Sequence, residues 1–221
     1  MSQLLVLRPE PGASATVARA KELGLDARAF PLFEIERVDW EPPEAASFDG
    51  LLLTSANSVR HAGDQLQPLR GLPVYAVGEA TAEAARDAGF DIRSSGDTGV
   101  DRLLGSIEPD LKLLHLCGED RRAPDRTKQQ ITALPVYRAK AIEDPALGDV
   151  GGSVALIHSP RAGRRLAELV SERGRVTIAA ISPAAAEAAG TGWRQIETAE
   201  APSDDALLAL AARLCNKPVP K

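Results

Sequence analysis

The sequence predicts an α/β protein built from two similar domains, each a doubly wound parallel sheet, that face each other across a cleft. Three observations lead to this prediction: an internal repeat, alternating strand and helix patterns, and a pair of extended segments near the middle of the chain. The repeat relates residues 51–55 to 155–159 and residues 78–81 to 182–185, each pair 104 positions apart. Two copies are too few for a solenoid, so the repeat indicates two related domains.

Short apolar runs alternate with alanine-rich helical patterns in both halves of the chain. Runs of this kind are typical of parallel strands that are covered on both faces, and their alternation with helices favours doubly wound sheets. In the first half, strands are expected at residues 4–7, 51–53, 74–77, 91–93 and 111–116, and helices at 13–23, 58–66, 80–88 and 100–107. In the second half, strands are expected at residues 154–157, 178–181 and 194–197, and helices at 162–170, 184–189 and 205–214.

Capping residues support these helix boundaries. A polar side chain just before a helix accepts a hydrogen bond from the first turn, and the candidates are Ser55 or Asn57, Ser159, Ser182 and Ser203. Proline near the first turn and glycine after the last turn are further boundary signals, and they occur at Pro160, Pro183, Pro202, Gly24, Gly89 and Gly174.

Two extended segments, residues 30–36 and 134–140, carry opposite charges. Glu34 and Glu36 in the first segment correspond to Arg138 and Lys140 in the second. Facing charges on paired strands contribute roughly a few tenths of a kcal/mol each, so we expect the two segments to form a two-stranded ladder. The expected division is residues 1–30 plus 141–221 for one domain, 38–132 for the other, and 31–37 and 133–140 for the connecting strands.

The composition indicates a soluble globular protein. The 221 residues are 44% hydrophobic and 26% charged, with a net charge of −5, which does not favour nucleic acid or an anionic membrane as a partner. Cys117 and Cys215 form no disulfide framework, and no apolar run is long enough for a signal peptide or a membrane span. We therefore expect a cytoplasmic protein, and a monomer because no long heptad pattern stands out.

The usual nucleotide-binding and hydrolase motifs are absent, and His61, His115 and His158 have no metal-ligand spacing. Instead, four expected strands end in small or hydroxyl residues that run into a helix. Ligands of open α/β sheets collect at this edge, where helix N-termini favour carboxylate or phosphate. The candidate binding residues are Thr54, Ser55, Asn57, Gly78, Thr81, Ser159, Pro160, Arg161 and Ser182. The alternative is that the serines and threonines are helix caps only.

Several cations lie near the same strand ends. Arg8 directly follows the first strand, and Arg161 follows residues 154–157, whereas Arg60 and Arg164 lie further along their helices. Arg121 and Arg122 are either ligand contacts or loop charges. Tyr137 lies in the second extended segment, where its phenol could donate a proton to a leaving hydroxyl; the alternative is a packing role like that of Phe33, its repeat counterpart.

Taken together, these features resemble the uroporphyrinogen-III synthase family. The resemblance rests on the order and spacing of eight short segments along the whole chain, at residues 5–9, 31–35, 53–59, 76–82, 116–120, 135–138, 158–162 and 181–186. It implies two flavodoxin-like domains joined by a two-stranded ladder, with the active site in the cleft. It also implies conversion of hydroxymethylbilane, a linear tetrapyrrole with eight carboxylates, to uroporphyrinogen III with inversion of ring D. No metal or organic cofactor is implied, and a transient hand-over of substrate from porphobilinogen deaminase is expected.

The resemblance also assigns roles to residues. Tyr137 matches the connector tyrosine that assists departure of the hydroxyl, and the substrate contacts would be Thr54, Ser55, Gly78, Thr81, Ser159, Pro160 and Arg161. The chain departs from the family pattern at Ser182, Ala185 and Cys117, the last standing where arginine is common. The competing interpretation is a non-catalytic binder or regulator that recognises a tetrapyrrole or another polycarboxylate. A flavin protein is disfavoured, since no phosphate loop is present.

Overall fold

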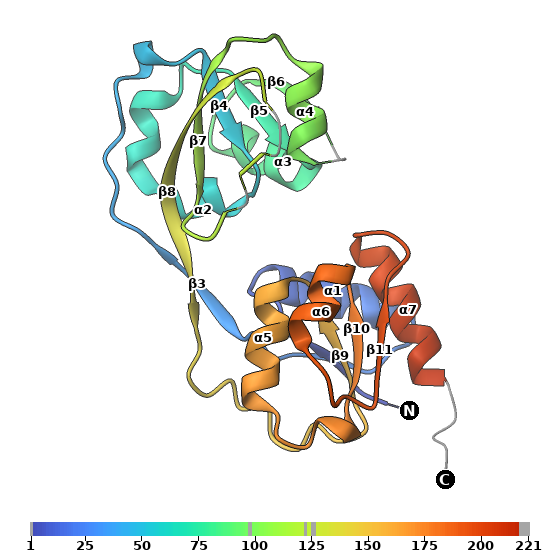
Figure 1. The fold of residues 1–221 in the computed structure, drawn as a ribbon. Helices are drawn as coiled ribbons and strands as arrows, with labels where there is room; N and C mark the ends of the chain where they lie inside the picture. Colours follow the sequence, from blue (N-terminus) through green and yellow to red (C-terminus); the bar gives the residue numbers. More distant parts are fainter. Residues whose placement is uncertain (1, 97–98, 122, 125–126, 217–221) are drawn as a thin grey trace. The chain divides into compact units, whose positions relative to one another are not determined.

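The computed structural model describes residues 2–96, 99–121, 123–124 and 127–216 (Figure 1). The chain divides into two compact units. Residues 1–34 with 141–221 form one, here called the terminal unit, and residues 35–140 form the other, the central unit. The predicted bounds were 1–30 plus 141–221 and 38–132, so residues 31–34 join the terminal unit and 35–37 and 133–140 the central one.

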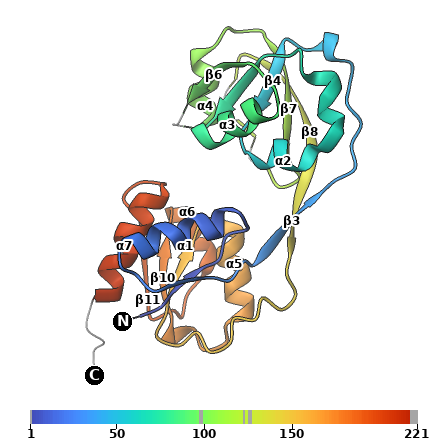
Figure 2. The same cartoon turned by 180° about the vertical axis from the view of Figure 1, so that it is seen from behind.

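The terminal unit holds a five-stranded parallel sheet in the order β11-β10-β9-β1-β2. Its strands are β1 (Leu4–Val6), β2 (Ala27–Ala29), β9 (Val154–Ile157), β10 (Thr177–Ala180) and β11 (Gln195–Thr198). Helices α5 (Pro160–Leu169) and α6 (Pro183–Ala189) cover one face, and α1 (Gly12–Glu22) and α7 (Asp204–Asn216) cover the other, as the opposite views in Figures 1 and 2 show. A short helix, η3 (Arg173–Arg175), precedes β10.

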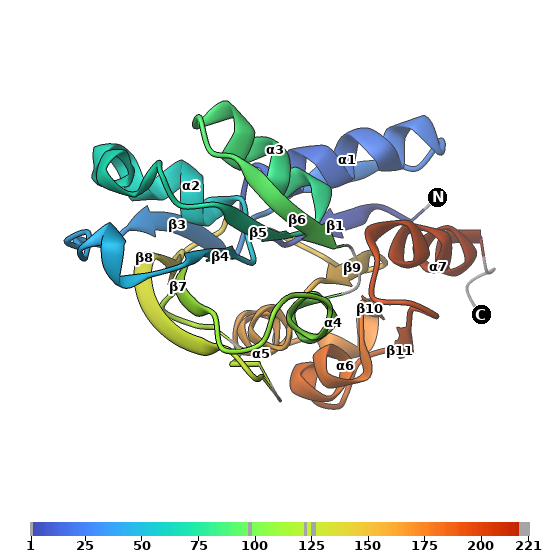
Figure 3. The ribbon, with the colours of Figure 1, turned by 90° about the horizontal axis from the view of Figure 1, so that it is seen from above.

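The central unit holds a six-stranded sheet in the order β3-β8-β7-β4-β5-β6. Its strands are β3 (Phe33–Arg37), β4 (Gly50–Leu53), β5 (Val74–Val77), β6 (Ile92–Gly96), β7 (Lys112–Gly118) and β8 (Gln130–Ala141). Helices α2 (Asn57–Ala62), η2 (Gly63–Leu69) and α3 (Glu79–Asp87) pack on one face, and α4 (Val100–Ser106) packs on the other (Figure 3). The short helix η1 (Ala45–Ser47) precedes β4. The predicted α/β class with parallel sheets is confirmed.

The internal repeat is preserved in the pairing of the strands. Leu51 of β4 pairs with Val74 of β5, and their counterparts, Ala155 and Ile178, pair between β9 and β10. Helices α3 and α4 begin at Glu79 and Val100, and α6 and α7 begin at Pro183 and Asp204, each 104 positions later. The two sheets therefore share one strand order over five strands, and β3 is an addition at the edge of the central one.

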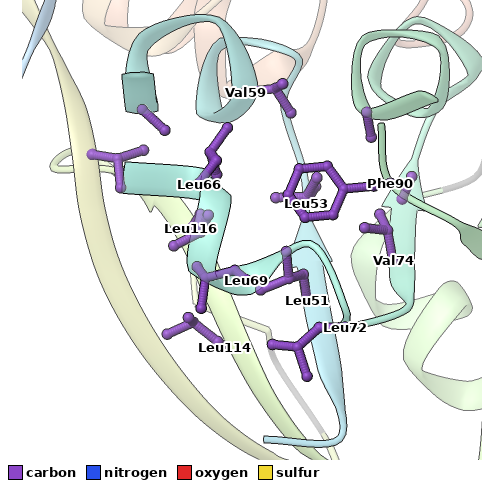
Figure 4. Packing of buried hydrophobic residues seen from close by; sticks show 14 of the residues in the cluster. Leu51, Leu53, Val59, Leu66, Leu69, Leu72, Val74, Phe90, Leu114 and Leu116 are labelled. Carbon is purple, nitrogen blue, oxygen red and sulfur yellow. The ribbon is translucent and has the colours of Figure 1, made fainter. Parts of the chain in front are cut away.

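Apolar central strands explain both sheets. All four residues of β4 and all four of β9 are buried, as expected for a parallel strand covered on both faces. In the central unit, leucines of β4 and β7 pack against the residues of α2 and η2, together with Val74 and Phe90 (Figure 4). Among the helices of the described residues, none has both the length and the apolar composition to cross a membrane.

Strands β3 and β8 are neighbours, and the expected opposite charges do meet. Glu36 accepts hydrogen bonds from Arg138 Nη2 at 3.0 Å and Lys140 Nζ at 2.8 Å, which lowers the pKa of Glu36. These ion pairs are exposed and contribute little to stability. Strand β8 also pairs with β7, up to Tyr137 opposite Gly118, so residues 133–137 belong to the larger sheet as well. Residues 138–140 lie beyond this pairing, where β8 has β3 as its neighbour.

The predicted caps are present on three helices. Ser159, Ser182 and Ser203 accept hydrogen bonds from the backbone N–H of Ala162, Ala185 and Ala206. The helix expected at residues 58–66 is shorter, because Gly63 adopts a φ of 72° and ends α2 after Ala62.

The packing of α5 on α6 gives a stability prediction. A Cβ at Gly163 would lie 2.9 Å from the backbone oxygen of Ala185 and the nitrogen of Ala189. We expect Gly163→Ala to lower the free energy of unfolding by about 1–3 kcal/mol, because the two helices must separate. Gly105→Ala on α4 is the control: a Cβ there has no neighbour within 4 Å, so stability should stay or rise by up to about 1 kcal/mol. Urea unfolding of both variants tests this, and equal effects would contradict it.

Candidate functional site

The strand ends of the central unit bring several of the predicted residues to one edge of its sheet. Leu53 of β4 pairs with Ala76 of β5 and with Leu116 of β7, so these three strands end together. Thr54 and Gly78 directly follow β4 and β5, and Gly118 ends β7. In a parallel sheet this carboxyl edge is where ligands bind.

Thr54 is held by a buried histidine that the sequence analysis did not assign to the site. Its Oγ1 lies 3.1 Å from Nε2 of His115, a residue of β7 that is 2% exposed. Burial, assisted by the positive charge of Arg121, lowers the pKa of His115 to about 4. The imidazole is therefore neutral at physiological pH, and the hydrogen bond fixes the orientation of the Thr54 hydroxyl.

The start of helix α2 presents polar groups of a different kind. Ser55 Oγ accepts a hydrogen bond from the backbone N–H of Asn57, at 3.2 Å. The hydroxyl proton of Ser55 stays available to a ligand, because the oxygen acts here only as an acceptor. The Asn57 side chain, a predicted cap, makes no capping hydrogen bond within the described residues.

Gly78 opens helix α3 with a φ of 82°. No atom lies within 4 Å of the place where its Cβ would be, so the backbone conformation rather than space requires glycine. Within the described residues, the N–H groups of Glu79 and Ala80 have no backbone acceptor, as expected for a first helical turn. Thr81, in contrast, is only 5% exposed, so little of it is available to a ligand.

Tyr137 lies against the end of β7. A Cβ on Gly118 would come within 2.9 Å of two ring carbons of Tyr137, so the ring rests directly on the glycine. The ring of His61 lies 6.3 Å away, centroid to centroid, and the carbonyl of Tyr137 accepts the N–H of Glu119 at 3.0 Å. The ring also packs against the buried core, as the packing alternative requires. Among the described residues its hydroxyl has no hydrogen-bond partner, so packing accounts for the ring and not for the phenol oxygen.

The terminal unit repeats this edge. Val6 of β1 pairs with Leu156 of β9, and Ile157 of β9 pairs with Ala180 of β10, so Arg8, Ser159 and Ser182 follow neighbouring strand ends. Ser159 Oγ accepts the Ala162 N–H at 3.2 Å and Ser182 Oγ accepts the Ala185 N–H at 3.3 Å. Pro160 and Pro183 occupy the first helical positions. Both serines are therefore caps, and both still have a hydroxyl proton to donate.

The two predicted cations of this unit differ in their surroundings. The guanidinium carbon of Arg161 lies 4.5 Å above the ring of Phe33, a cation–π contact that holds the side chain near the start of α5. Arg8 lies across the start of α1, where a Cβ on Gly12 would meet its Nε at 2.6 Å. Its charged partner among the described residues is Asp204, with Arg8 Nη1 3.7 Å from Asp204 Oδ1.

Asp204, the first residue of α7, was missed by the sequence analysis. Its side chain is 16% exposed. It accepts hydrogen bonds from His158 Nε2 at 2.9 Å, Thr16 Oγ1 at 3.0 Å and Arg19 Nη1 at 3.3 Å. Burial opposes its ionisation, but the hydrogen bond and charge of His158, the Thr16 hydroxyl and the charge of Arg8 lower its pKa. One sequence signal could have drawn attention to this cluster: His158, its imidazole, is the repeat counterpart of the predicted binding residue Thr54.

The remaining residues singled out in the sequence have other surroundings. Cys117 is 1% exposed, and burial raises the pKa of its thiol, so this departure from the family pattern points into the core. Ala185 is fully buried. Arg60, Arg121 and Arg164 are exposed, and Arg122 lies outside the described residues. Within the described ranges, three or more His, Cys, Asp or Glu side chains nowhere gather as metal ligands do.

The buried His115 gives a prediction about pH. Its pKa of about 4 lies below the ordinary value of 6.5, so the unfolded chain binds more protons between these values. Stability therefore falls as the pH drops, by about 2 kcal/mol between pH ~7 and pH ~5 from this residue alone. In His115→Gln the loss over the same range should be smaller by that amount. Denaturant unfolding at both pH values tests this, and an identical loss in both proteins would count against it.

Comparisons with known proteins point to one family. A family model described as uroporphyrinogen-III synthase HemD matches residues 14–209. The chain is 34% identical over 101 residues to the uroporphyrinogen-III synthase of Chlorobaculum parvum, a match that covers 42% of this chain and 41% of that relative. The matched region thus spans less than half of the relative's length.

Two solved structures share the fold. One is the uroporphyrinogen-III synthetase of Helicobacter pylori, with a TM-score of 0.68, 19% identity and coverage of 97% of this chain and 100% of that one. The other is a mutant uroporphyrinogen III synthase of Thermus thermophilus, with a TM-score of 0.54, 20% identity and coverage of 98% and 100%. Since the family model matches most of the sequence, the chain belongs to the uroporphyrinogen-III synthase family.

Proposed function

We propose that this protein is a uroporphyrinogen-III synthase, a lyase that converts hydroxymethylbilane to uroporphyrinogen III. The observation that carries the proposal is the family match over residues 14–209. The polar groups at each sheet edge support it, because each edge carries hydroxyl groups and helix N-termini of the kind that bind carboxylates.

The reaction forms one carbon–carbon bond and releases water. The terminal hydroxyl group leaves with a proton, and the substituted carbon of ring D attacks the resulting electrophilic carbon to form a spiro intermediate. The bond from that ring carbon to its original methylene bridge then breaks, and the bridge bonds to the free α-carbon of ring D. Loss of a proton from this carbon restores the pyrrole, now inverted. Without the enzyme, the bilane closes without inversion to the type I isomer. The task of the protein is therefore to hold ring D in the orientation that leads to attack, and orientation alone can accelerate a reaction strongly.

Binding of the eight substrate carboxylates is assigned to the two edges. The hydroxyls of Ser55, Ser159 and Ser182 accept bonds from their helices and keep protons to donate. Arg8 and Arg161 add positive charge, and the first-turn N–H groups of α3 add donors that need no side chain. We assign Thr54, Asn57, Gly78 and Pro160 to the same set of substrate contacts. Thr81 is its weakest member, because it is buried.

Tyr137 is the proposed proton donor to the leaving hydroxyl. Two features support this role: its ring is held against Gly118, and its hydroxyl has no hydrogen-bond partner among the described residues. A fixed ring with an uncommitted phenol suits general acid catalysis.

The chemistry requires no transfer of electrons, so we propose that the reaction proceeds without a metal or an organic cofactor. Because the substrate also closes spontaneously, we propose a direct hand-over from porphobilinogen deaminase. We further propose that the enzyme acts as a monomer in the cytoplasm, which agrees with two free, buried cysteines.

An isomer assay tests the proposed function. Porphobilinogen and its deaminase generate the bilane, this protein is added, and the oxidised products are separated into type I and type III porphyrins. We expect predominantly type III. Only type I from folded protein would overturn the proposal and favour a non-catalytic tetrapyrrole binder.

Replacing Tyr137 tests the proton donor. We expect Tyr137→Phe to lower kcat about 100-fold or more while leaving the thermal midpoint close to that of the wild type, because only an unpaired hydroxyl is lost. Tyr75→Phe is the matched control: Tyr75 is the other tyrosine of the chain, is 4% exposed and lies within β5. Its kcat should not change. Equal kcat values for Tyr137→Phe and wild type would remove Tyr137 from this role.

A further inference from the structure

His158 occupies the position in the terminal unit that Thr54 occupies in the central unit. Each is the first residue after the central strand, and β9 and β4 are 104 positions apart throughout. Thr54 is tied to His115, whereas His158 is tied to Asp204. The imidazole thus stands at a strand end where the other copy has a proposed substrate contact.

Asp204 determines which nitrogen of His158 carries the proton. The Nε2 atom lies 2.9 Å from Asp204 Oδ1. An ionised carboxylate only accepts hydrogen bonds, so Nε2 carries a proton in either form of the ring, and in the neutral form it is the only protonated nitrogen. In that neutral form the Nδ1 atom has a lone pair and acts as an acceptor.

This Nδ1 atom is buried and unpaired. In the described part of the chain, two buried side-chain polar atoms lack a hydrogen-bond partner, His158 Nδ1 and Arg165 Nε. The Arg165 guanidinium is otherwise well satisfied, since it donates to Glu168 at 3.0 Å and to the carbonyl of Ile142 at 2.9 Å. The His158 side chain is 8% exposed. An unpaired acceptor at this depth is unfavourable, and it calls for a donor that is supplied from outside the chain.

The chemistry of the substrate identifies that donor. Its eight carboxylates are ionised and would be repelled by a lone pair, whereas the pyrrole N–H groups donate hydrogen bonds. We propose that His158 is a further substrate-binding residue, whose Nδ1 accepts a hydrogen bond from a pyrrole N–H while Asp204 positions the ring. The assignment rests on the proposed function.

The Nδ1 atom is buried, so a donor reaches it only when a neighbouring side chain moves. Arg8, which shares Asp204 with the imidazole, is suited to move. It is long, its side chain is 38% exposed, and its contact with Asp204 at 3.7 Å is longer than a hydrogen bond. A substrate carboxylate that draws Arg8 away from Asp204 would remove one neighbour of the His158–Asp204 pair.

Two substitutions separate the two nitrogens of the ring. In His158→Gln the side-chain amide takes roughly the place of Nε2 and keeps the bond to Asp204, but no acceptor remains at Nδ1. We expect its thermal midpoint to stay near that of the wild type and its KM for the bilane to rise about tenfold, the loss of one hydrogen bond. In His158→Asn the amide oxygen takes roughly the place of Nδ1, so KM should change less while the thermal midpoint falls. Wild-type KM in His158→Gln would overturn the assignment.

A spectroscopic test uses the unmodified protein. The chain has only three histidines, so the imidazole ¹⁵N resonances can be assigned with His158→Gln as the reference. Saturation with uroporphyrinogen III under reducing conditions should shift the Nδ1 resonance of His158 upfield within the range of an unprotonated nitrogen. No shift, or a shift into the range of a protonated nitrogen, would overturn the role as acceptor.

The isomer assay distinguishes the two possible failures. Wild-type protein that yields only the type I isomer overturns the proposed function and this assignment with it. Wild-type protein that yields the type III isomer, with an indifferent His158→Gln variant, overturns the role of His158 alone.

Discussion

Burial of both faces of the two central strands is the constraint on which the rest of the structure depends. All residues of strands β4 and β9 are buried, so neither strand presents a polar side chain to solvent or to a ligand along its length. Polar groups can appear only where these strands end and a helix begins. The parallel register then aligns the ends of the neighbouring strands, which concentrates hydroxyls, N–H groups and cations at one edge of each sheet.

The two copies keep their backbone and differ in their polar chemistry. In the pairing of the sheets, β7 of the central unit takes the place of β1 of the terminal unit, which makes Cys117 the counterpart of Arg8. The terminal copy thus has a cation at this position, while the central copy has a buried thiol. The central copy also has Tyr137, whose hydroxyl has no hydrogen-bond partner among the described residues. In the proposed function, the terminal copy therefore supplies the cation at this position, and the central copy supplies the proton donor.

Local sequence patterns were sufficient for the strands, the helices and the caps of α5, α6 and α7, because those features depend on residues close together in the chain. Three features of the site could not be predicted in this way. The bond between Thr16 and Asp204 joins residues 188 positions apart, and that between Thr54 and His115 joins residues 61 apart. The contact of Tyr137 with Gly118 depends on a shift of register between β7 and β8. The pairing of residues 133–137 with β7 could not be predicted for the same reason, because it joins segments that are not adjacent in the chain.

A carboxylate at an edge that is proposed to bind carboxylates needs a physical explanation, and the hydrogen bonds of Asp204 supply one. Its oxygens accept hydrogen bonds from His158, Thr16 and Arg19, and its side chain is 16% exposed. An anion bound at this edge would therefore be separated from the carboxylate by the side chains of these donors. Its negative charge compensates the cations beside it and fixes where their remaining N–H groups point. Recognition at this edge then depends on directed hydrogen bonds more than on excess positive charge, which is consistent with a net charge of −5. Such a site selects a substrate by the placement of its polar groups, which is what discrimination between two orientations of one pyrrole ring requires.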